Sequence, residues 1–205
     1  QARSLRVVEG QPASPSKPAG RRLLGTVPLA EDGSFQVQVP ANTPLELQLL
    51  DQDGLAVRRS AWLWTRNHAA QGCVGCHEDP ERTPPNRFAK AFAAPAPVLS
   101  LPPEKRRSVG YAAEVRPVIE TRCLTCHGDE GKGPRLDLSH NGLRPFLAPG
   151  EARRSRLLWH LVGRNTARPW DAEAGGAAPM PMPGAPLAAD EIRTFIEWID
   201  LGAQP

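Results

Sequence analysis

The chain has 205 residues, of which 23 are Pro and 18 are Gly, and its formal net charge is +3. Glycine follows no three-residue period, which excludes collagen, and no apolar run approaches the roughly 18 residues of a transmembrane helix. The small net charge and the lack of a long basic block argue against nucleic-acid binding. What remains is a loop-rich protein with few aromatic side chains, so we expect something other than side chains to supply part of its core.

The first part of the chain is predicted to be a small antiparallel β domain, residues 1–94. Residues 1–20 are polar and Pro-rich, and we expect them to wrap the surface without regular structure. Apolar and polar side chains then alternate with the period of a half-buried strand. Turn signals that contain Gly separate the apolar stretches. The expected strands are 23–29, 35–39, 45–49 and 55–64.

The β domain ends in the sequence Cys73-Val74-Gly75-Cys76-His77. C-x-x-C-H is the attachment motif of c-type haem. Its two thiols bond to the vinyl groups of one porphyrin, and the next residue lies under the iron as the proximal ligand. We therefore predict that Cys73 and Cys76 hold a haem and that His77 ligates its iron.

A Pro-rich stretch, residues 79–108, follows the first motif and contains seven Pro. Such a composition favours stiff, extended chain. We interpret residues 95–108 as an interdomain linker.

Residues 109–205 are predicted to form an all-α domain. Tyr111, Val115 and Ile119 lie on one face of a helix that leads into the second motif, and Pro117 starts or kinks this helix. A second helix is expected at 151–163. A third begins at Asp190 as its N-cap and ends at Gly202.

The second motif is Cys123-Leu124-Thr125-Cys126-His127, so two copies of C-x-x-C-H use all four Cys of the chain. A Cys₄ zinc site would have its pairs about 15–20 residues apart, whereas 46 residues separate Cys76 from Cys123. We therefore predict two covalently bound haem c groups, with His127 as the second proximal ligand. Because bacteria attach this haem outside the cytoplasm, we expect a processed, periplasmic or extracellular chain.

A helix that ends in C-x-x-C-H, a long loop, and two helices separated by a Met-Pro loop is the layout of a class I type cytochrome c domain. Met180 lies between prolines that would hold its thioether over the iron, and Met–His ligation raises the reduction potential. Met180 is thus the expected distal ligand of the second haem, with Met182 or an ordinary loop role as alternatives. Arg135, in the loop after the second motif, is a candidate partner for a haem propionate.

The sequence does not decide which residue is the distal ligand of the first haem. His68 lies five residues before Cys73 and could reach over the ring edge, and it could equally be a surface residue. His160, in an apolar helix, is a packing residue or a distal ligand to either iron. His140 is expected at the surface, and an open first iron is a further alternative.

Several segments resemble a known family. The second half resembles cytochrome c domains common in planctomycete-type proteins, on the residues Val115-Arg116-Pro117-Val118-Ile119, Cys123–His127, Met180-Pro181 and Ile196-Glu197-Trp198-Ile199-Asp200-Leu201-Gly202-Ala203. The first half resembles the middle domain of the hydrazine synthase alpha subunit and its homologues, on the residues Val27-Pro28, Glu31-Asp32-Gly33-Ser34-Phe35, Val39-Pro40-Ala41, Ala61-Trp62 and Gly72–Glu78.

The resemblance implies a dihaem protein with a β-rich haem domain followed by a cytochrome c domain. It also implies an unusual ligand just after the first motif in the synthase. This chain has Glu78, Asp79 and Glu81 there and no Tyr.

From these features we expect a periplasmic dihaem c-type cytochrome, an electron carrier and not an enzyme. It would pass electrons between redox partner proteins, alone or as a subunit of a larger redox complex. The alternative is a haem enzyme similar to hydrazine synthase alpha, in which an open first iron acts on a small molecule and the second haem feeds it electrons. A high-spin iron that binds CO would favour the enzyme.

Overall fold

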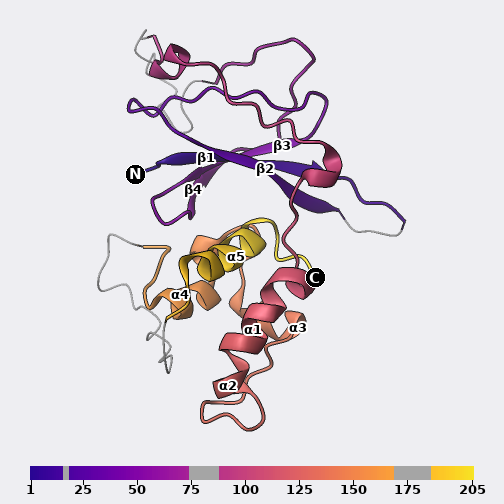
Figure 1. The fold of residues 1–205 in the computed structure, drawn as a ribbon, viewed down its shortest axis with the longest axis vertical. Helices are drawn as coiled ribbons and strands as arrows, with labels where there is room; N and C mark the ends of the chain where they lie inside the picture. Colours follow the sequence, from indigo (N-terminus) through magenta and orange to yellow (C-terminus); the bar gives the residue numbers. More distant parts are fainter. Residues whose placement is uncertain (16–18, 74–87, 169–185) are drawn as a thin grey trace. The chain divides into compact units, whose positions relative to one another are not determined.

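The computed structural model describes residues 1–15, 19–73, 88–168 and 186–205 (Figure 1). They belong to two compact units, a β unit of residues 1–107 and a helical unit of residues 108–205. A small antiparallel sheet and several helices make the chain an α+β protein, which confirms the predicted class at this level. None of the helices in the described ranges is long and apolar enough to cross a membrane.

The β unit contains a four-stranded antiparallel sheet in the order β2-β1-β3-β4. Its strands are β1 (Ser4–Gln11), β2 (Gly20–Pro28), β3 (Leu45–Leu50) and β4 (Ala56–Arg59). β1 lies in the middle, and Val7 pairs with Gly25 of β2 and with Leu47 of β3. The expectation that residues 1–20 only wrap the surface is therefore wrong for residues 4–11. Leu5 and Val7 are fully buried and belong to the core of the sheet.

Residues 35–39 alternate as a strand does but do not join the sheet. Gln38 forms one isolated parallel bridge with Val98. The apolar members of the stretch, Phe35, Val37 and Val39, pack against the core instead. The alternation thus reflects an extended segment that turns one side toward the core. This segment does not pair with a strand of the sheet.

The Pro-rich segment that precedes Ser108 lies along the β unit. Leu99 N donates to Gln38 O at 2.8 Å, and Leu23 N donates to Arg107 O at 2.7 Å. Glu9 adds a charged contact, because its carboxylate accepts from Arg106 Nη1 at 2.6 Å. Residues 97–107 are therefore bound to the sheet and its loops and belong to this unit.

The helical unit is built around short helices. Its elements are a π-helix, η3 (Tyr111–Val115), which runs directly into α1 (Arg116–Arg122), then α2 (Leu124–His127), α3 (His140–Leu143), α4 (Arg156–Val162) and α5 (Ala189–Asp200). Single 3₁₀ turns are η1 (Lys90–Ala93) and η2 (Pro103–Lys105) in the β unit, and η4 (Arg144–Phe146) and η5 (Ala152–Arg154) in the helical unit. Pro117 lies in the first turn of α1, where its missing N–H costs no helix bond.

The N-cap of α5 lies two residues before the predicted N-cap, Asp190. The cap residue is Ala188, and Asp190 lies in the first turn. Glu191 Oε2 accepts from Ala188 N at 2.7 Å and so satisfies one of the exposed amides of this helix end. The apolar face of α5 supplies the fully buried side chains Phe195, Trp198 and Ile199 to the core of the unit.

Candidate haem attachment sites

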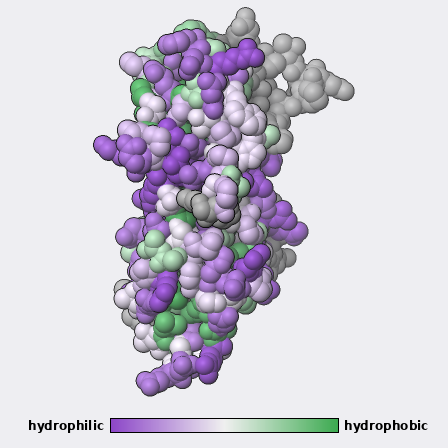
Figure 2. Space-filling model, turned by 90° about the vertical axis from the view of Figure 1, so that its right-hand side faces the viewer, coloured by the Kyte–Doolittle hydropathy of each residue, from purple (hydrophilic) through white to green (hydrophobic). Residues whose placement is uncertain are grey.

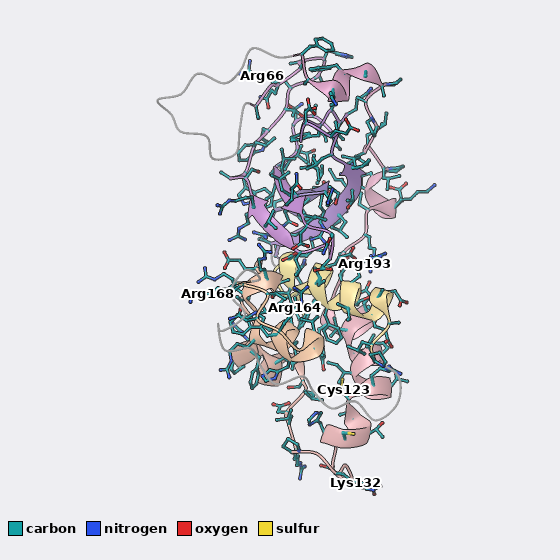
Figure 3. All side chains as sticks on the ribbon, turned by 90° about the vertical axis from the view of Figure 1, so that its left-hand side faces the viewer. Arg66, Cys123, Lys132, Arg164, Arg168 and Arg193 are labelled. Atoms are coloured by element: carbon teal, nitrogen blue, oxygen red, sulfur yellow. The ribbon has the colours of Figure 1, made fainter. Side chains whose placement is uncertain are left out.

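The second C-x-x-C-H motif lies where two helices meet. Cys123 ends α1 and begins α2, and its amide donates to Ile119 O at 2.9 Å. The helical turn continues through the motif, because His127 N donates to Cys123 O at 2.9 Å. Residues three apart on a helix lie on neighbouring positions of one face. α2 therefore places the side chains of Cys123 and Cys126 on one side of the turn (Figure 3 labels Cys123).

The ring of His127 is fixed by a backbone carbonyl. Its Nδ1 lies 2.8 Å from Pro134 O. A carbonyl oxygen can only accept, so Nδ1 carries the proton and donates it. In a neutral imidazole this leaves the lone pair on Nε2, and a second partner of this kind is what orients metal-ligating histidines. This contact leaves the lone pair of His127 Nε2 available to a metal, and the ligand role of His127 stays a prediction.

The loop after the motif approaches the motif so closely that it needs Gly. Gly133 N donates to Cys126 O at 2.8 Å, and a Cβ at Gly133 would lie 2.9 Å from that same oxygen. A Cβ at Gly131 would overlap Cys126 O outright. The two glycines thus let the chain turn back under the motif and bring Pro134 to His127.

The thiols and the apolar side chains of the second motif fit a covalently attached haem. Cys123 and Cys126 both carry free thiols. Cys123 is buried, and this burial raises the pKa of its thiol. Leu124 and Leu136, each 41% exposed, add apolar surface beside the motif. Two thiols, an oriented imidazole and neighbouring apolar side chains are the set that a haem c requires.

Arg135 is an exposed side chain in the loop that follows the second motif. Its Nη2 lies 2.6 Å from Asp129 Oδ1, and both side chains are more than three-quarters exposed. The propionate role of Arg135 stays a prediction.

The first motif lies mostly outside the described residues. Cys73 is described and exposed, with a free thiol. Cys76 and His77 fall in 74–87, and their predicted roles stay predictions.

Hydrogen bonds to the β unit hold the described chain on both sides of the first motif. Before it, Asn42 N donates to Thr65 O at 2.8 Å. After it, Lys90 N donates to Asp32 Oδ2 at 2.9 Å, and Ala91 N donates to Ser34 Oγ at 3.0 Å. The bond from Lys90 N, together with the bond from Ser34 Oγ to Asp32, lowers the pKa of Asp32 from 3.8 to about 2.

Exposed aromatic side chains occur on both sides of the first motif. Trp64 is 56% exposed, and Phe88 and Phe92 are 82% and 58% exposed. Phe88 and Phe92 contact each other, with ring centroids 5.6 Å apart. Apolar side chains reach the surface in the helical unit as well (green in Figure 2). Contiguous exposed apolar side chains mark a binding surface more often than single ones do, and these rings flank the first C-x-x-C-H motif in the sequence.

The candidate distal ligands lie in different settings. His68 is exposed in a turn with a φ of 56°, and Ala69 N closes the turn on Arg66 O. His160 is half-buried on α4. Met180 and Met182 lie in 169–185, outside the described residues, so the predicted ligation by Met180 stays a prediction.

His140 differs from the expectation of a surface residue. Its Nε2 lies 2.8 Å from Ala203 O, and its ring contacts those of Tyr111 and Trp198. His140 thus joins α3 to the C-terminal residues, and its Nε2 is engaged in the contact with Ala203 O.

Two features of the sites were missed at the level of sequence. One is the Pro134 carbonyl, for which the sequence Gly131-Lys132-Gly133-Pro134 was the available signal. The other is the exposed ring pair of Phe88 and Phe92, which no motif marks.

Comparison with known proteins shows a consistent similarity. Residues 3–78 match the family of the hydrazine synthase alpha subunit middle domain. The chain is 22% identical over 273 aligned residues to hydrazine synthase subunit alpha of Kuenenia stuttgartiensis, a match that covers 90% of this chain and 33% of that protein. Its fold resembles a chain of the solved Kuenenia stuttgartiensis hydrazine synthase, with a TM-score of 0.70 and 19% identity over 98% of this chain and 38% of that chain.

These matches correct one expectation. The proteins that the chain resembles are an enzyme, hydrazine synthase, and a subunit of it. The expectation of an electron carrier that is not an enzyme is therefore wrong. The chain spans about a third of the relatives it matches. Residues 3–78 match the hydrazine synthase alpha subunit middle domain, and almost the whole length of this chain shares the fold of part of one chain of that solved structure.

Proposed function

We propose that this chain is the haem-bearing part of a redox enzyme subunit similar to hydrazine synthase alpha. The first motif would hold a haem with an open iron position for a small molecule, and the second would hold a haem that exchanges electrons with it. Further subunits would be its partners, outside the cytoplasm. The observation that carries the proposal is the hydrogen bond from His127 Nδ1 to Pro134 O, because it leaves Nε2 as a ligand beside two free thiols.

The residues of the second motif would have separate roles in haem attachment and iron ligation. Haem supplies an iron that exchanges single electrons and, where an axial position is open, binds small molecules. Cys123 and Cys126 would form the thioether bonds, and His127 would hold the iron from one side. Arg122 Nη2 donates to Pro186 O at 2.9 Å, which ties the chain six residues after Met180 to the end of α1, the helix that leads into Cys123. This contact supports Met180 as the ligand on the other side.

The first site has few candidates for a second axial ligand. Apart from His77, residues 1–107 contain one His, His68, and no Met. His68 is exposed in a tight turn. This supply of ligands supports an open position at the first iron.

The test is CO binding to the reduced chain, expressed with the c-type haem attachment machinery. We expect two covalent haems by pyridine haemochrome assay and one CO bound per chain. The variant Cys73→Ala/Cys76→Ala should lose the CO-binding haem, whereas Cys123→Ala/Cys126→Ala should keep it. Two attached haems with no CO binding would overturn the enzyme proposal.

A further inference from the structure

An ion pair lies directly beside the second haem motif. Arg122 immediately precedes Cys123, and its Nε lies 3.5 Å from Glu191 Oε1. The two side chains are 29% and 24% exposed, so the pair is partly shielded from water. Charge interactions of this kind are screened less than those of exposed pairs.

The pair is held in place by its neighbours. Arg122 Nη2 donates to Pro186 O at 2.9 Å, while Glu191 Oε2 accepts from Ala188 N at 2.7 Å. Each charged group thus makes a backbone contact in addition to the ion pair. The pair joins the end of α1 to the start of α5, with both charges at defined positions near Cys123.

Both charges act at the sulfur of Cys123. Burial is the main cause that raises the pKa of this thiol, the charge of Arg122 acts in the opposite direction, and the charge of Glu191 adds to the rise. The two charges lie near this thiol because Arg122 directly precedes Cys123 in the chain and its Nε is 3.5 Å from Glu191 Oε1. A group attached through that sulfur would lie next to the same two charges.

We propose that the Arg122–Glu191 pair sets the reduction potential of the haem attached to Cys123 and Cys126, with Arg122 favouring the reduced state and Glu191 the oxidised state. This rests on the proposed function. Reduction of ferric to ferrous haem by one electron makes the site one charge more negative. A nearby cation stabilises that product, and a nearby anion destabilises it. Arg122 and Glu191 are tuning and positioning residues, since neither would ligate the iron.

The experiment is an equilibrium redox titration of the full dihaem chain with dithionite and mediators. The titration should show one reduction step for each haem. The step of the second haem is the one that is lost in Cys123→Ala/Cys126→Ala. Arg122→Gln should lower this potential, and Glu191→Gln should raise it, each by about threefold to tenfold in the equilibrium constant for reduction. The double variant should return close to the original value.

A matched control exists on the same helix. Arg116 Nε lies 2.6 Å from Glu120 Oε1, and these side chains are 61% and 48% exposed. Arg116→Gln and Glu120→Gln change the net charge equally but lie in water, so they should shift the second potential much less. If they shift it as much as the Arg122 and Glu191 variants do, the proposal is overturned.

One further variant separates charge from packing. Arg122→Lys keeps the charge but loses the fork of donors that reaches Pro186 and Glu191. We expect its potential to stay close to that of the original chain. A drop as large as that of Arg122→Gln would overturn the electrostatic role. Failure of the haemochrome assay to find haem at the second motif would instead contradict the proposed function.

Discussion

His127 and Pro134 are joined by a hydrogen bond of 2.8 Å between the ring Nδ1 and the backbone carbonyl. The bond spans only seven residues, yet it fixes which ring nitrogen is protonated and which can ligate a metal. It exists because two glycines let the intervening loop lie against the motif. The ligand geometry of the second site is therefore a property of the loop as much as of the motif.

Replacement of Gly131 by Ala should disturb this loop. The new Cβ would overlap Cys126 O, so the backbone must move. We expect a loss of about 1–3 kcal/mol in the free energy of unfolding, measured by urea denaturation, together with less covalent haem at the second motif. Gly72→Ala is the control, because its Cβ would meet no atom of the described residues within 4 Å. Equal stability of the two variants would contradict this account of the loop.

Replacement of Glu9 by Gln should release the segment before Ser108. Its carboxylate, 8% exposed, accepts from Arg106 and also pairs with Arg22 at 3.0 Å. Removal of one charge from a buried ion pair costs about 3 kcal/mol, which urea unfolding would show. Limited proteolysis should then cut within 97–107. Glu31→Gln, which breaks the exposed pair with Lys90, should leave unfolding unchanged. An intact 97–107 segment in Glu9→Gln would exclude Glu9 as its anchor.

The low pKa of Asp32 predicts that the stability of the β unit falls in acid. Its pKa is about 2 in the folded chain against 3.8 ordinarily, because Lys90 N and Ser34 donate to it. The carboxylate therefore stabilises the fold above pH 4, and this contribution disappears as the pH falls from about 4 to 2. Asp32→Asn should unfold earlier in urea than the original chain at pH 6, and the difference should vanish near pH 2. A difference that is independent of pH would contradict this role.

Phe88 provides a test of the first site. With 82% of its surface exposed, its replacement by Ala should leave the unfolding of the haem-free chain unchanged. If the ring covers the first haem, Phe88→Ala should admit water and lower the potential of that haem, as measured by redox titration. Val98→Ala, at a residue 61% exposed in the same unit, is the control. Equal potentials in the two variants would argue against contact between Phe88 and the haem.

The sequence predicted those elements whose signal was local. The helix into Cys123 and the last helix were found because apolar residues recur with the helical period. Residues 4–11 were missed because the prolines just after them dominated the composition of the N-terminal stretch, although Leu5, Val7 and Val8 carry a strand signal. Residues 35–39 were assigned to the sheet because a pattern of alternation reports burial on one side and not hydrogen-bonded pairing.

In the sites, too, the local features could be predicted from the sequence and the long-range contacts could not. The C-x-x-C-H motifs are contiguous in sequence, so the residue types themselves indicate haem attachment. The contacts of Arg122 with Pro186 and Glu191 span more than 60 residues, and His140 contacts Ala203 across 63. Such pairs depend on how the helices pack, which no local pattern encodes.

The most direct test of the proposed enzyme is the spin state of the two irons in the oxidised chain, measured by electron paramagnetic resonance. We expect one high-spin and one low-spin haem, with the high-spin signal absent from Cys73→Ala/Cys76→Ala. Two low-spin haems would contradict the open position at the first iron, and with it the proposal that a small molecule reacts there.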